Sequence, residues 1–174
     1  MNRESDDQIA AFLDTMRRVK LLVLDVDGVL TDGRLFYGAK GELLKAFHVR
    51  DGHGIKQVSG AGITVAIISG RKSEAVLRRA RGLGIKHVYQ GVDDKLAALH
   101  KLARSLKVSL EHCACVGDDT PDAPILDACG LGVAVADAHA DALAAADIET
   151  TRPGGHGAVR EVCDWLMAAR RAPA

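Results

Sequence analysis

Residues 20–31 read KLLVLDVDGVLT, and this stretch decides the fold. Aliphatic and β-branched residues fill it up to Val26, interrupted only by Asp25, which is typical of a strand buried on both faces of a parallel sheet. Asp25 and Asp27 are separated by one residue, so on an extended chain both side chains leave the same face, and Gly28 allows a turn directly after them. The stretch therefore predicts a buried strand with paired carboxylates at its carboxyl end.

This acidic pair admits two explanations. Asp-Gly is common turn chemistry, so Asp27 and Gly28 could form an ordinary corner after the strand. Two close carboxylates, however, repel each other and resist joint ionisation unless a cation or hydrogen-bond donors compensate. A metal site or a proton-transfer role is the better explanation of the pair.

The composition is that of an ordinary globular protein. The chain has 174 residues, of which 48% are hydrophobic and 26% charged, and this predicts a single domain over residues 1–174 with a substantial core. The 23 Lys and Arg residues balance 23 Asp and Glu, so net charge does not indicate a polyanionic partner. Aromatic residues are too few to build stacking platforms for single-stranded nucleic acid.

The cysteines and the hydropathy pattern indicate the cellular compartment in which the protein resides. The four cysteines lack C-x-x-C spacing and lie in apolar segments, which favours reduced thiols and offers no zinc-ligand spacing. They are Cys113, Cys115, Cys129 and Cys163. The N-terminal residues carry no export signal, and no segment approaches membrane-spanning length. We therefore expect a cytoplasmic protein.

Polar residues also follow the second predicted strand, over residues 63–68. That strand ends in Ser69, Gly70 and Arg71, and a helix is expected over residues 72–81. A small hydroxyl, a glycine that lets backbone approach and a helix N-terminus together make an anion pocket, although Ser-Gly alone is a common loop.

Two further groups complete the pattern. Lys95 opens an amphipathic helix predicted over residues 92–106, where the helix dipole favours acids, so a Lys directed at a phosphate is more attractive than a solvating one. An apolar strand at 113–116 ends in GDDTPD, residues 117–122, whose acids could also simply cap the next helix. Because the carboxyl ends of parallel strands meet at one edge, we expect all these groups to converge on one crevice.

Residues 34–49 interrupt the strand-to-helix rhythm and predict a β-hairpin with Gly38 and Gly41 at its turn, overhanging the carboxylates. Its apolar residues would be exposed and would invite pairing with another copy of the chain, so we expect an oligomer. They are Leu35, Phe36, Leu43 and Phe47. The following HVRDGHG, residues 48–54, predicts a Gly-rich corner before a helix at 55–59, and could hold ligand oxygens or be a surface turn.

The remaining elements are predicted from periodicity alone. Residues 5–19 predict a helix with Ser5 as N-cap and an inner face of Ile9, Phe12, Leu13 and Met16. A short strand is expected near residues 87–89, a strand at 132–136, a helix at 140–145 and a last helix at 157–170. The inner stripe expected for that last helix is Val159, Val162, Cys163 and Leu166.

These groups suit phosphoryl transfer assisted by Mg²⁺, a cation that prefers oxygen ligands. Asp25 would be the nucleophile, with Ser69 and Lys95 stabilising the phosphoryl oxygens. Asp27 would protonate the leaving alcohol and then activate water. Asp118 would complete the metal site.

The motifs DVDGVLT, SGR, Lys95 and GDDTPD resemble, in order and rough spacing, the four motifs of the haloacid dehalogenase (HAD) phosphatase superfamily. HVRDGHGI, YQGVDDKL and GGHGAVREVCDWL resemble its 3-deoxy-D-manno-octulosonate (KDO) 8-phosphate phosphatases, which serve lipopolysaccharide biosynthesis. The resemblance implies a HAD-like Rossmannoid three-layer α/β sandwich with a central parallel sheet, no cap domain and a β-hairpin flap after strand 1. It also implies a Mg²⁺-dependent cytoplasmic homotetramer that hydrolyses KDO 8-phosphate through an aspartyl phosphate, with neighbouring subunits supplying the missing lid.

Carried over residue by residue, the resemblance makes Asp25 nucleophile and metal ligand, Asp27 acid/base and ligand through its carbonyl, and Asp118 the remaining ligand. Ser69 and Lys95 would hold the phosphate. It implies that the substrate is contacted by Asp27, Gly28, His48, Val49, Arg50, Asp51, Gly52, Lys56, Gly70, Arg71, Arg79 and Lys95.

Some of these assignments have competing explanations. Arg79 would also fit as an ordinary surface residue, and Lys56 stands where Arg would be the more natural partner for a carboxylate. Residues 154–157, GGHG, predict a flexible link when taken alone, whereas in the resembling family the segment 152–174 reaches an adjacent active site. The sequence assigns no role to Asp119 or Asp122.

Other functions explain the same residues less well. Related enzymes act on nonulosonate 9-phosphates, although SGRK at residues 69–72 favours the eight-carbon acid by resemblance. A non-catalytic module that senses phosphate or Mg²⁺ would have no use for the second acid, Asp27. A nucleotide-dependent dehydrogenase fits worse, because no G-x-G-x-x-G follows the first strand.

Overall fold

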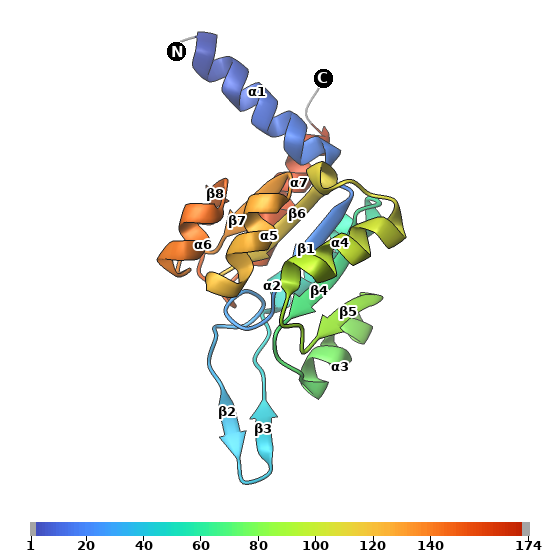
Figure 1. The fold of residues 1–174 in the computed structure, drawn as a ribbon, viewed down its shortest axis with the longest axis vertical. Helices are drawn as coiled ribbons and strands as arrows, with labels where there is room; N and C mark the ends of the chain where they lie inside the picture. Colours follow the sequence, from blue (N-terminus) through green and yellow to red (C-terminus); the bar gives the residue numbers. More distant parts are fainter. Residues whose placement is uncertain (1–2, 172–174) are drawn as a thin grey trace.

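The computed structural model describes residues 3–171, with side chains from residue 10 onward. Its centre is a parallel six-stranded sheet in the order β5-β4-β1-β6-β7-β8 (Figure 1). The strands are β1 (Leu21–Leu24), β4 (Thr64–Ser69), β5 (His87–Gln90), β6 (Cys113–Gly117), β7 (Leu131–Ala134) and β8 (Ile148–Glu149). The α/β class and the parallel sheet predicted from the strand patterns are confirmed.

Strand β1 lies in the middle of the sheet. Leu22 pairs in register with Val65 of β4 on one side and Ala114 of β6 on the other, and all four β1 residues are fully buried. A strand with neighbours on both edges and helices on both faces has no exposed position, which explains its continuous aliphatic composition. From β1, the sheet extends on one side through β4 and β5 and on the other through β6, β7 and β8, so the strand order switches direction at β1. In open α/β sheets, ligands bind beyond the carboxyl ends of the strands at such a switch point.

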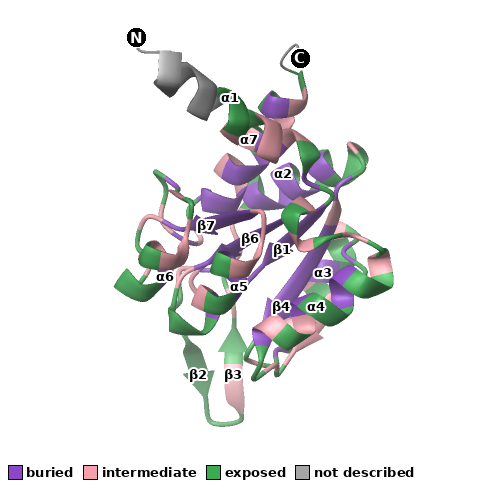
Figure 2. Cartoon of the chain, turned by 45° about the horizontal axis from the view of Figure 1, so that its top comes forward, coloured by how far each residue is buried: buried purple, intermediate pink, exposed green. Residues whose placement is uncertain are grey.

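Helices cover both faces of the sheet and make three layers. One core cluster joins Leu22 and Leu24 to α1 (Arg3–Arg18), α2 (Val49–Gly60), α3 (Glu74–Leu83) and α7 (Ala158–Arg171). The other joins Leu21 and Val23 to α4 (Lys95–Leu106), α5 (Ala123–Ala128) and α6 (Ala140–Ala145). Alternate strand residues thus serve opposite faces. Figure 2 shows the buried strands between these partly exposed helices.

Helix α2 corrects a prediction. It begins at Val49, so residues expected as a Gly-rich corner form its first turns, and His48 Nδ1 accepts a hydrogen bond from the Arg50 N–H. The glycines serve packing instead: a Cβ on Gly52 would lie 2.3 Å from Arg79 Nη2, and one on Gly54 would lie 3.0 Å from Cys163 Cβ of α7. Close tertiary contact overrides the low helix propensity of glycine here.

Other boundaries differ by a few residues. Helix α4 begins at Lys95 because Asp94 caps it, its Oδ1 accepting from Ala97 N at 2.9 Å, and strand β8 was not expected. In α1, Phe12 and Met16 pack against the core but Leu13 is 38% exposed, contrary to expectation. The side chains of Ser5 and Ile9 lie outside the described residues. The expected inner stripe of α7 is fully buried.

A hairpin of β2 (Phe36–Gly38) and β3 (Gly41–Leu44) leaves the sheet after β1 and projects beyond its end (Figure 1). Its turn has Gly41 at φ +109°, a conformation that side chains rarely adopt. Five large apolar residues are exposed on it, namely Leu35, Phe36, Tyr37, Leu43 and Leu44. Phe47, expected among them, packs against the core instead. Two one-turn helices, η1 (Leu110–His112) and η2 (Thr120–Asp122), precede and follow β6.

Within residues 3–171, no helix combines the length and the apolar character that crossing a membrane requires.

Candidate active site

A hollow of about 220 Å³ lies at the carboxyl ends of β1, β4 and β6, beside the start of α4. It is lined by Asp25, Asp27, Ser69, Gly70, Arg71, Lys95, Asp118, Asp119, Pro121 and Asp122. Strand ends far apart in the sequence meet here because the strands are parallel and adjacent. The four motif regions predicted to converge do so.

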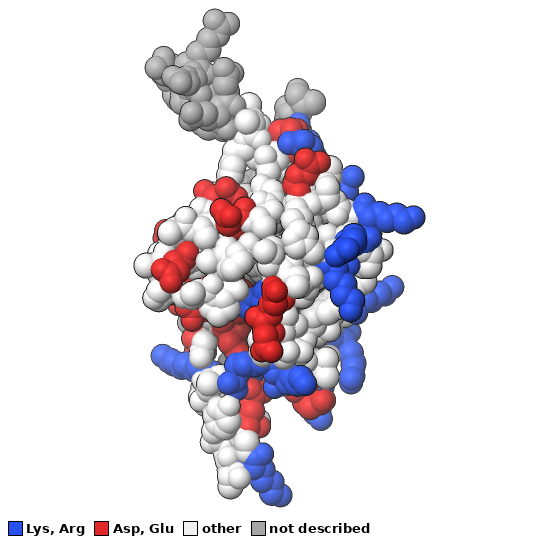
Figure 3. Space-filling model, viewed as in Figure 1, with Lys and Arg blue, Asp and Glu red and all other residues white. Residues whose placement is uncertain are grey.

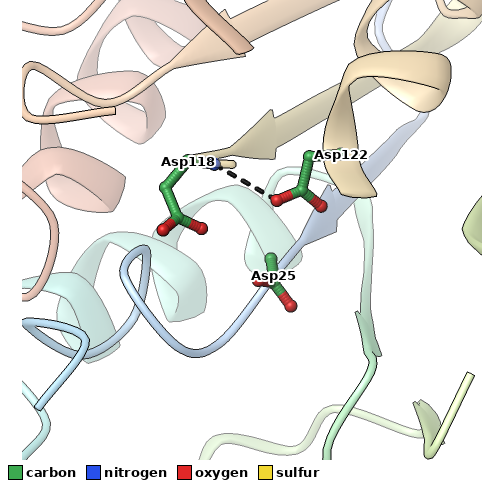
Figure 4. Close-up of side chains that lie close together, drawn as sticks. All are labelled: Asp25, Asp118 and Asp122. Atoms are coloured by element: carbon green, nitrogen blue, oxygen red, sulfur yellow. Dashed lines mark hydrogen bonds between the residues drawn. The ribbon is translucent and has the colours of Figure 1, made fainter. Parts of the chain in front are cut away.

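Three carboxylates form the centre of the hollow. Asp25 follows β1, Asp118 follows β6 and Asp122 ends η2, and one oxygen of each lies within 4.8 Å of the others (Figure 4). Burial, followed by the neighbouring Asp122, raises the pKa of Asp25 to about 7. Burial, followed by Asp25, raises the pKa of Asp118 to about 8. The folded chain therefore holds acids whose joint ionisation needs a cation.

These residues fit a magnesium ion. Asp25 Oδ1 is buried and makes no hydrogen bond within the described residues; its close partner is the Lys95 ammonium at 3.2 Å, which leaves a lone pair for a metal ion. All the donor atoms are carboxylate oxygens, the hard ligands that Mg²⁺ takes, and there is no sulfur or imidazole ligand in the group. Gly28 allows the close approach, since a Cβ there would lie 1.9 Å from Asp118 Oδ2.

Lys95 lies beside the same carboxylates. Its Nζ is 3.2 Å from Asp25 Oδ1 and 2.6 Å from Asp122 Oδ1, and its side chain is 5% exposed. Burial alone would lower the pKa of this ammonium, but Asp25 and Asp122 outweigh that effect and raise the pKa of Lys95. A permanent cation at this point can offset the negative charge of a phosphoryl group.

Asp122 orders the loop around this cation, a role that the sequence did not indicate. Its Oδ1 accepts from Lys95, and its Oδ2 accepts from Asp118 N at 3.2 Å and Asp119 N at 3.5 Å. Asp119, in contrast, is exposed and caps η2, with Oδ1 accepting from Thr120 N at 2.7 Å. The sequence signal for Asp122 was its place in the run GDDTPD after the strand, whose acids could also cap the next helix.

Asp27 lies at the rim of the hollow and is paired with two cations. Its Oδ1 accepts from Lys45 Nζ, and Arg71 Nε lies 3.3 Å from its Oδ2. Lys45 directly follows β3 and was missed from the sequence, where it reads as one more hairpin residue. Ser69 ends β4 and is 3% exposed, so its hydroxyl is held in place by packing.

Of the residues expected at the sugar acid, Arg71 lines the hollow around Asp25, whereas the others lie elsewhere. Val49, Gly52, Lys56 and Arg79 line a separate hollow of about 220 Å³. Arg79 Nη2 donates to the carbonyl of His48 at 3.3 Å, and its guanidinium lies 5.8 Å from the Phe47 ring. Arg79 is therefore half-buried and contacts the segment before α2 of its own subunit, and none of these four residues lines the hollow around Asp25.

Asp51 and Arg50 face a third region. Asp51 is 1% exposed, and its Oδ1 accepts from Arg160 N at 2.8 Å, so it caps the start of α7. Arg50 lines a larger hollow together with Arg152 and Arg160. The place of Asp51 in helix α2 directs it at α7, and Asp51 does not line the hollow around Asp25.

The Gly-rich segment before α7 corrects one of its two expectations, namely that residues 154–157 form a flexible link. Instead, Gly155 N donates to Val29 O at 3.0 Å, and a Cβ on Gly154 would lie 1.6 Å from Gly28 O. The segment packs behind the catalytic loop of its own subunit.

The comparisons with known proteins agree with this geometry. A family model described as haloacid dehalogenase-like hydrolase matches residues 87–161. The 3-deoxy-D-manno-octulosonate 8-phosphate phosphatase KdsC of Escherichia coli K12 is 51% identical over 152 residues, which is 87% of this chain and 81% of that protein. This chain belongs to the KdsC phosphatase family. Solved KdsC phosphatase structures confirm the resemblance and the HAD fold.

The phosphatase from Yersinia pestis superposes with a TM-score of 0.88 at 47% identity, covering 91% of this chain and 85% of that one. The phosphatase from Moraxella catarrhalis, in complex with a magnesium ion, a phosphate ion and KDO, superposes with a TM-score of 0.90 at 43% identity. That match covers 93% of each chain.

Proposed function

We propose that this protein is a magnesium-dependent phosphatase that hydrolyses KDO 8-phosphate to KDO and inorganic phosphate, for lipopolysaccharide biosynthesis. The observation that carries the proposal is the convergence of Asp25, Lys95 and Asp118 on one hollow in a chain of the KdsC phosphatase family. Carboxylates around an oxygen-preferring cation, with a buried ammonium beside them, suit transfer of a phosphoryl group.

In the proposed first step, a carboxylate oxygen of Asp25 attacks phosphorus and the bond from phosphorus to the sugar oxygen breaks. The leaving oxygen takes a proton from the carboxyl group of Asp27. In the second step, the Asp27 carboxylate takes a proton from water, the water oxygen attacks phosphorus, and the bond to Asp25 breaks. Phosphate is released and Asp25 is restored.

The other proposed roles concern charge and position. Asp25, Asp118 and the main-chain carbonyl of Asp27 would hold Mg²⁺, which would neutralise phosphoryl charge. Ser69 donates to a phosphoryl oxygen, and Lys95 pairs with the phosphate charge. Gly28 and Gly70 allow the substrate to approach the backbone, and Arg71 pairs with the sugar carboxylate.

We propose that the assembly is a homotetramer in which neighbouring subunits complete each site. The exposed apolar hairpin supports this, since such a surface favours burial against another copy. The second hollow supports it as well, because Lys56 and Arg79 line it and not the hollow around their own Asp25, so their cations could serve the substrate of a neighbour. Of residues 48–52, Val49 and Gly52 line this second hollow, and the substrate roles expected for them would be exercised there.

We further propose that residues 1–174 form one domain, with a hairpin insertion at 34–49 and a C-terminal segment at 152–174, located in the cytoplasm. The single main sheet, with core clusters on both faces, supports the one domain. Four free cysteines are consistent with a reducing compartment. Localisation of a tagged protein by fractionation tests the compartment.

The function is tested by phosphate release from a panel of sugar phosphates with and without Mg²⁺. We expect KDO 8-phosphate to give the highest kcat/KM, with nonulosonate 9-phosphates and simple hexose phosphates well below it. Asp25→Asn, which keeps the shape of the side chain, is the control and should be inactive. A preference for a nonulosonate 9-phosphate would overturn the substrate assignment, and turnover by the Asn variant would overturn the nucleophile.

A further inference from the structure

The side chain of Lys45 connects the hairpin to Asp27. Its Nζ donates to Asp27 Oδ1 and lies 3.3 Å from Glu42 Oε2, and the side chain is only 1% exposed. An ammonium removed from water in this way is costly unless it is paired. Its place is therefore set by these two carboxylates.

Further hydrogen bonds and an ion pair near Lys45 and Asp27 connect the hairpin to the rest of the protein. Glu42 accepts from Ser73 Oγ, at the start of α3, and lies 3.7 Å from Arg71 Nη2. Tyr37 Oη accepts from Arg71 Nη2 at 2.7 Å. Figure 3 shows acidic and basic side chains gathered where the hairpin meets the body. Several hydrogen bonds and ion pairs that act together restrain Lys45 more strongly than a single surface ion pair could.

The two oxygens of Asp27 have different surroundings. Oδ1 accepts from Lys45, whereas Oδ2 is buried and accepts no hydrogen bond from the described residues. Arg71 Nε lies 3.3 Å from Oδ2 as an ion pair, and it too makes no hydrogen bond there. An acid/base carboxyl works best with its orientation fixed and one oxygen free to carry the proton.

We propose that Lys45 is a positioning residue for the proton transfers of Asp27. It holds Oδ1, so that Oδ2 stays available to the leaving oxygen in the first step and to water in the second. This inference rests on the proposed acid/base role of Asp27. It gives the hairpin a part in the chemistry of its own subunit, in addition to its exposed apolar surface.

The test compares two leaving groups in Lys45→Met, which keeps the length of the side chain and removes the donor. A sugar alkoxide needs a proton as it leaves, whereas p-nitrophenolate does not. We expect kcat/KM for KDO 8-phosphate to fall by roughly tenfold to a hundredfold, and kcat/KM for p-nitrophenyl phosphate to stay within about threefold. kcat/KM isolates the first step, since water enters only after the leaving group has gone.

Three further variants control the comparison. Lys45→Arg keeps the cation and should recover most of the loss on KDO 8-phosphate. Lys40→Met makes the same substitution at the exposed hairpin turn and should match the parent on both substrates. Asp27→Asn should show the same dependence on the leaving group as Lys45→Met, but a larger loss.

An equal loss of kcat/KM on both substrates in Lys45→Met, with Asp27→Asn still selective, overturns the role of Lys45 and leaves that of Asp27 standing. A failure of Asp27→Asn to discriminate overturns the acid/base assignment and the inference with it. If Lys45→Met does not fold, as judged by thermal unfolding, Lys45→Gln undergoes the same comparison with the same criteria.

Discussion

Gly154 lies directly against Gly28: a Cβ on Gly154 would stand 1.6 Å from the carbonyl oxygen of Gly28. Gly28 has φ +91° and itself leaves no room for a side chain beside Asp118. Gly154 N is held in turn by Asp137 Oδ1 at 2.8 Å. The turn before α7 thus supports the loop that carries the catalytic acids, through backbone contact alone.

Gly154→Ala should displace this loop. We expect the variant to lose about 1–3 kcal/mol of stability, as overpacked sites do, and to lose more than about tenfold in kcat, because the loop after Asp25 must shift. Thermal unfolding and steady-state kinetics check both. Gly60→Ala is the control, since a Cβ there meets nothing within 4 Å, and it should be neutral. Full activity in Gly154→Ala would show that the loop tolerates the displacement.

Asp122→Ala should damage the site more than Asp119→Asn. It removes the closer of the two carboxylates that pair with Lys95 and leaves the Asp118 N–H without its acceptor. We therefore expect a loss of about 1–3 kcal/mol in stability and a kcat/KM lower by at least about tenfold. Asp119→Asn keeps an exposed cap and should be near neutral. Equal effects of the two substitutions would contradict the assignment.

Asp118→Asn should weaken magnesium binding without destabilising the metal-free protein. Without Mg²⁺ the wild-type chain holds Asp118 with its pKa raised to about 8, so removing this carboxylate should leave the metal-free protein equally or more stable. Mg²⁺ should raise the Tm of the wild-type protein, but hardly that of the variant. Chelation should abolish wild-type activity, and restored Mg²⁺ should return it. A Tm rise of equal size in both proteins would place the ion elsewhere.

Asp51 should leave a signature in the pH dependence of stability. Burial raises its pKa above 3.8, although the Arg160 N–H, His48 and Arg79 oppose this. The folded state therefore binds the Asp51 proton more tightly than the unfolded state, so its contribution to the free energy of unfolding is largest below 3.8 and falls as the pH rises through the folded pKa.

Asp51→Asn keeps the acceptor for Arg160 N and removes the charge. We expect the stability of the wild type minus that of the variant to decrease from about pH 4 to about pH 7, as measured by urea unfolding. Taking this difference in stability removes the contributions of the other titrating groups, because the two proteins share them. A difference that rises over this range would show that Asp51 is stabilised as an anion.

The hairpin should control assembly. Leu43 is 71% exposed in the single chain, so Leu43→Glu costs no core packing within the subunit, yet it places a charge on the apolar surface. We expect a lower molar mass by light scattering and an unchanged circular dichroism spectrum. Leu13→Glu, at an exposed position of α1, is the matched control and should keep the mass. An unchanged mass in Leu43→Glu would place the interface elsewhere.

Much of the fold follows from local patterns. The aliphatic runs before Asp25, Ser69 and Asp118 required buried strands, and parallel strands carry their carboxyl ends to one edge whatever the connecting loops do. Catalytic candidates could therefore be found by their place after a strand. The order of elements was predicted well, and their ends less well, because caps such as Asp94 decide where a helix starts.

The sequence by itself determined which residues end the strands, and hence the carboxylates, the hydroxyl and the ammonium of the hollow. Only the tertiary structure decided that Asp51 caps α7, that Lys45 reaches Asp27 and that Gly154 supports Gly28. The reason is physical: strand ends are specified by periodicity within a few residues, whereas these contacts join elements whose approach depends on how the whole core packs.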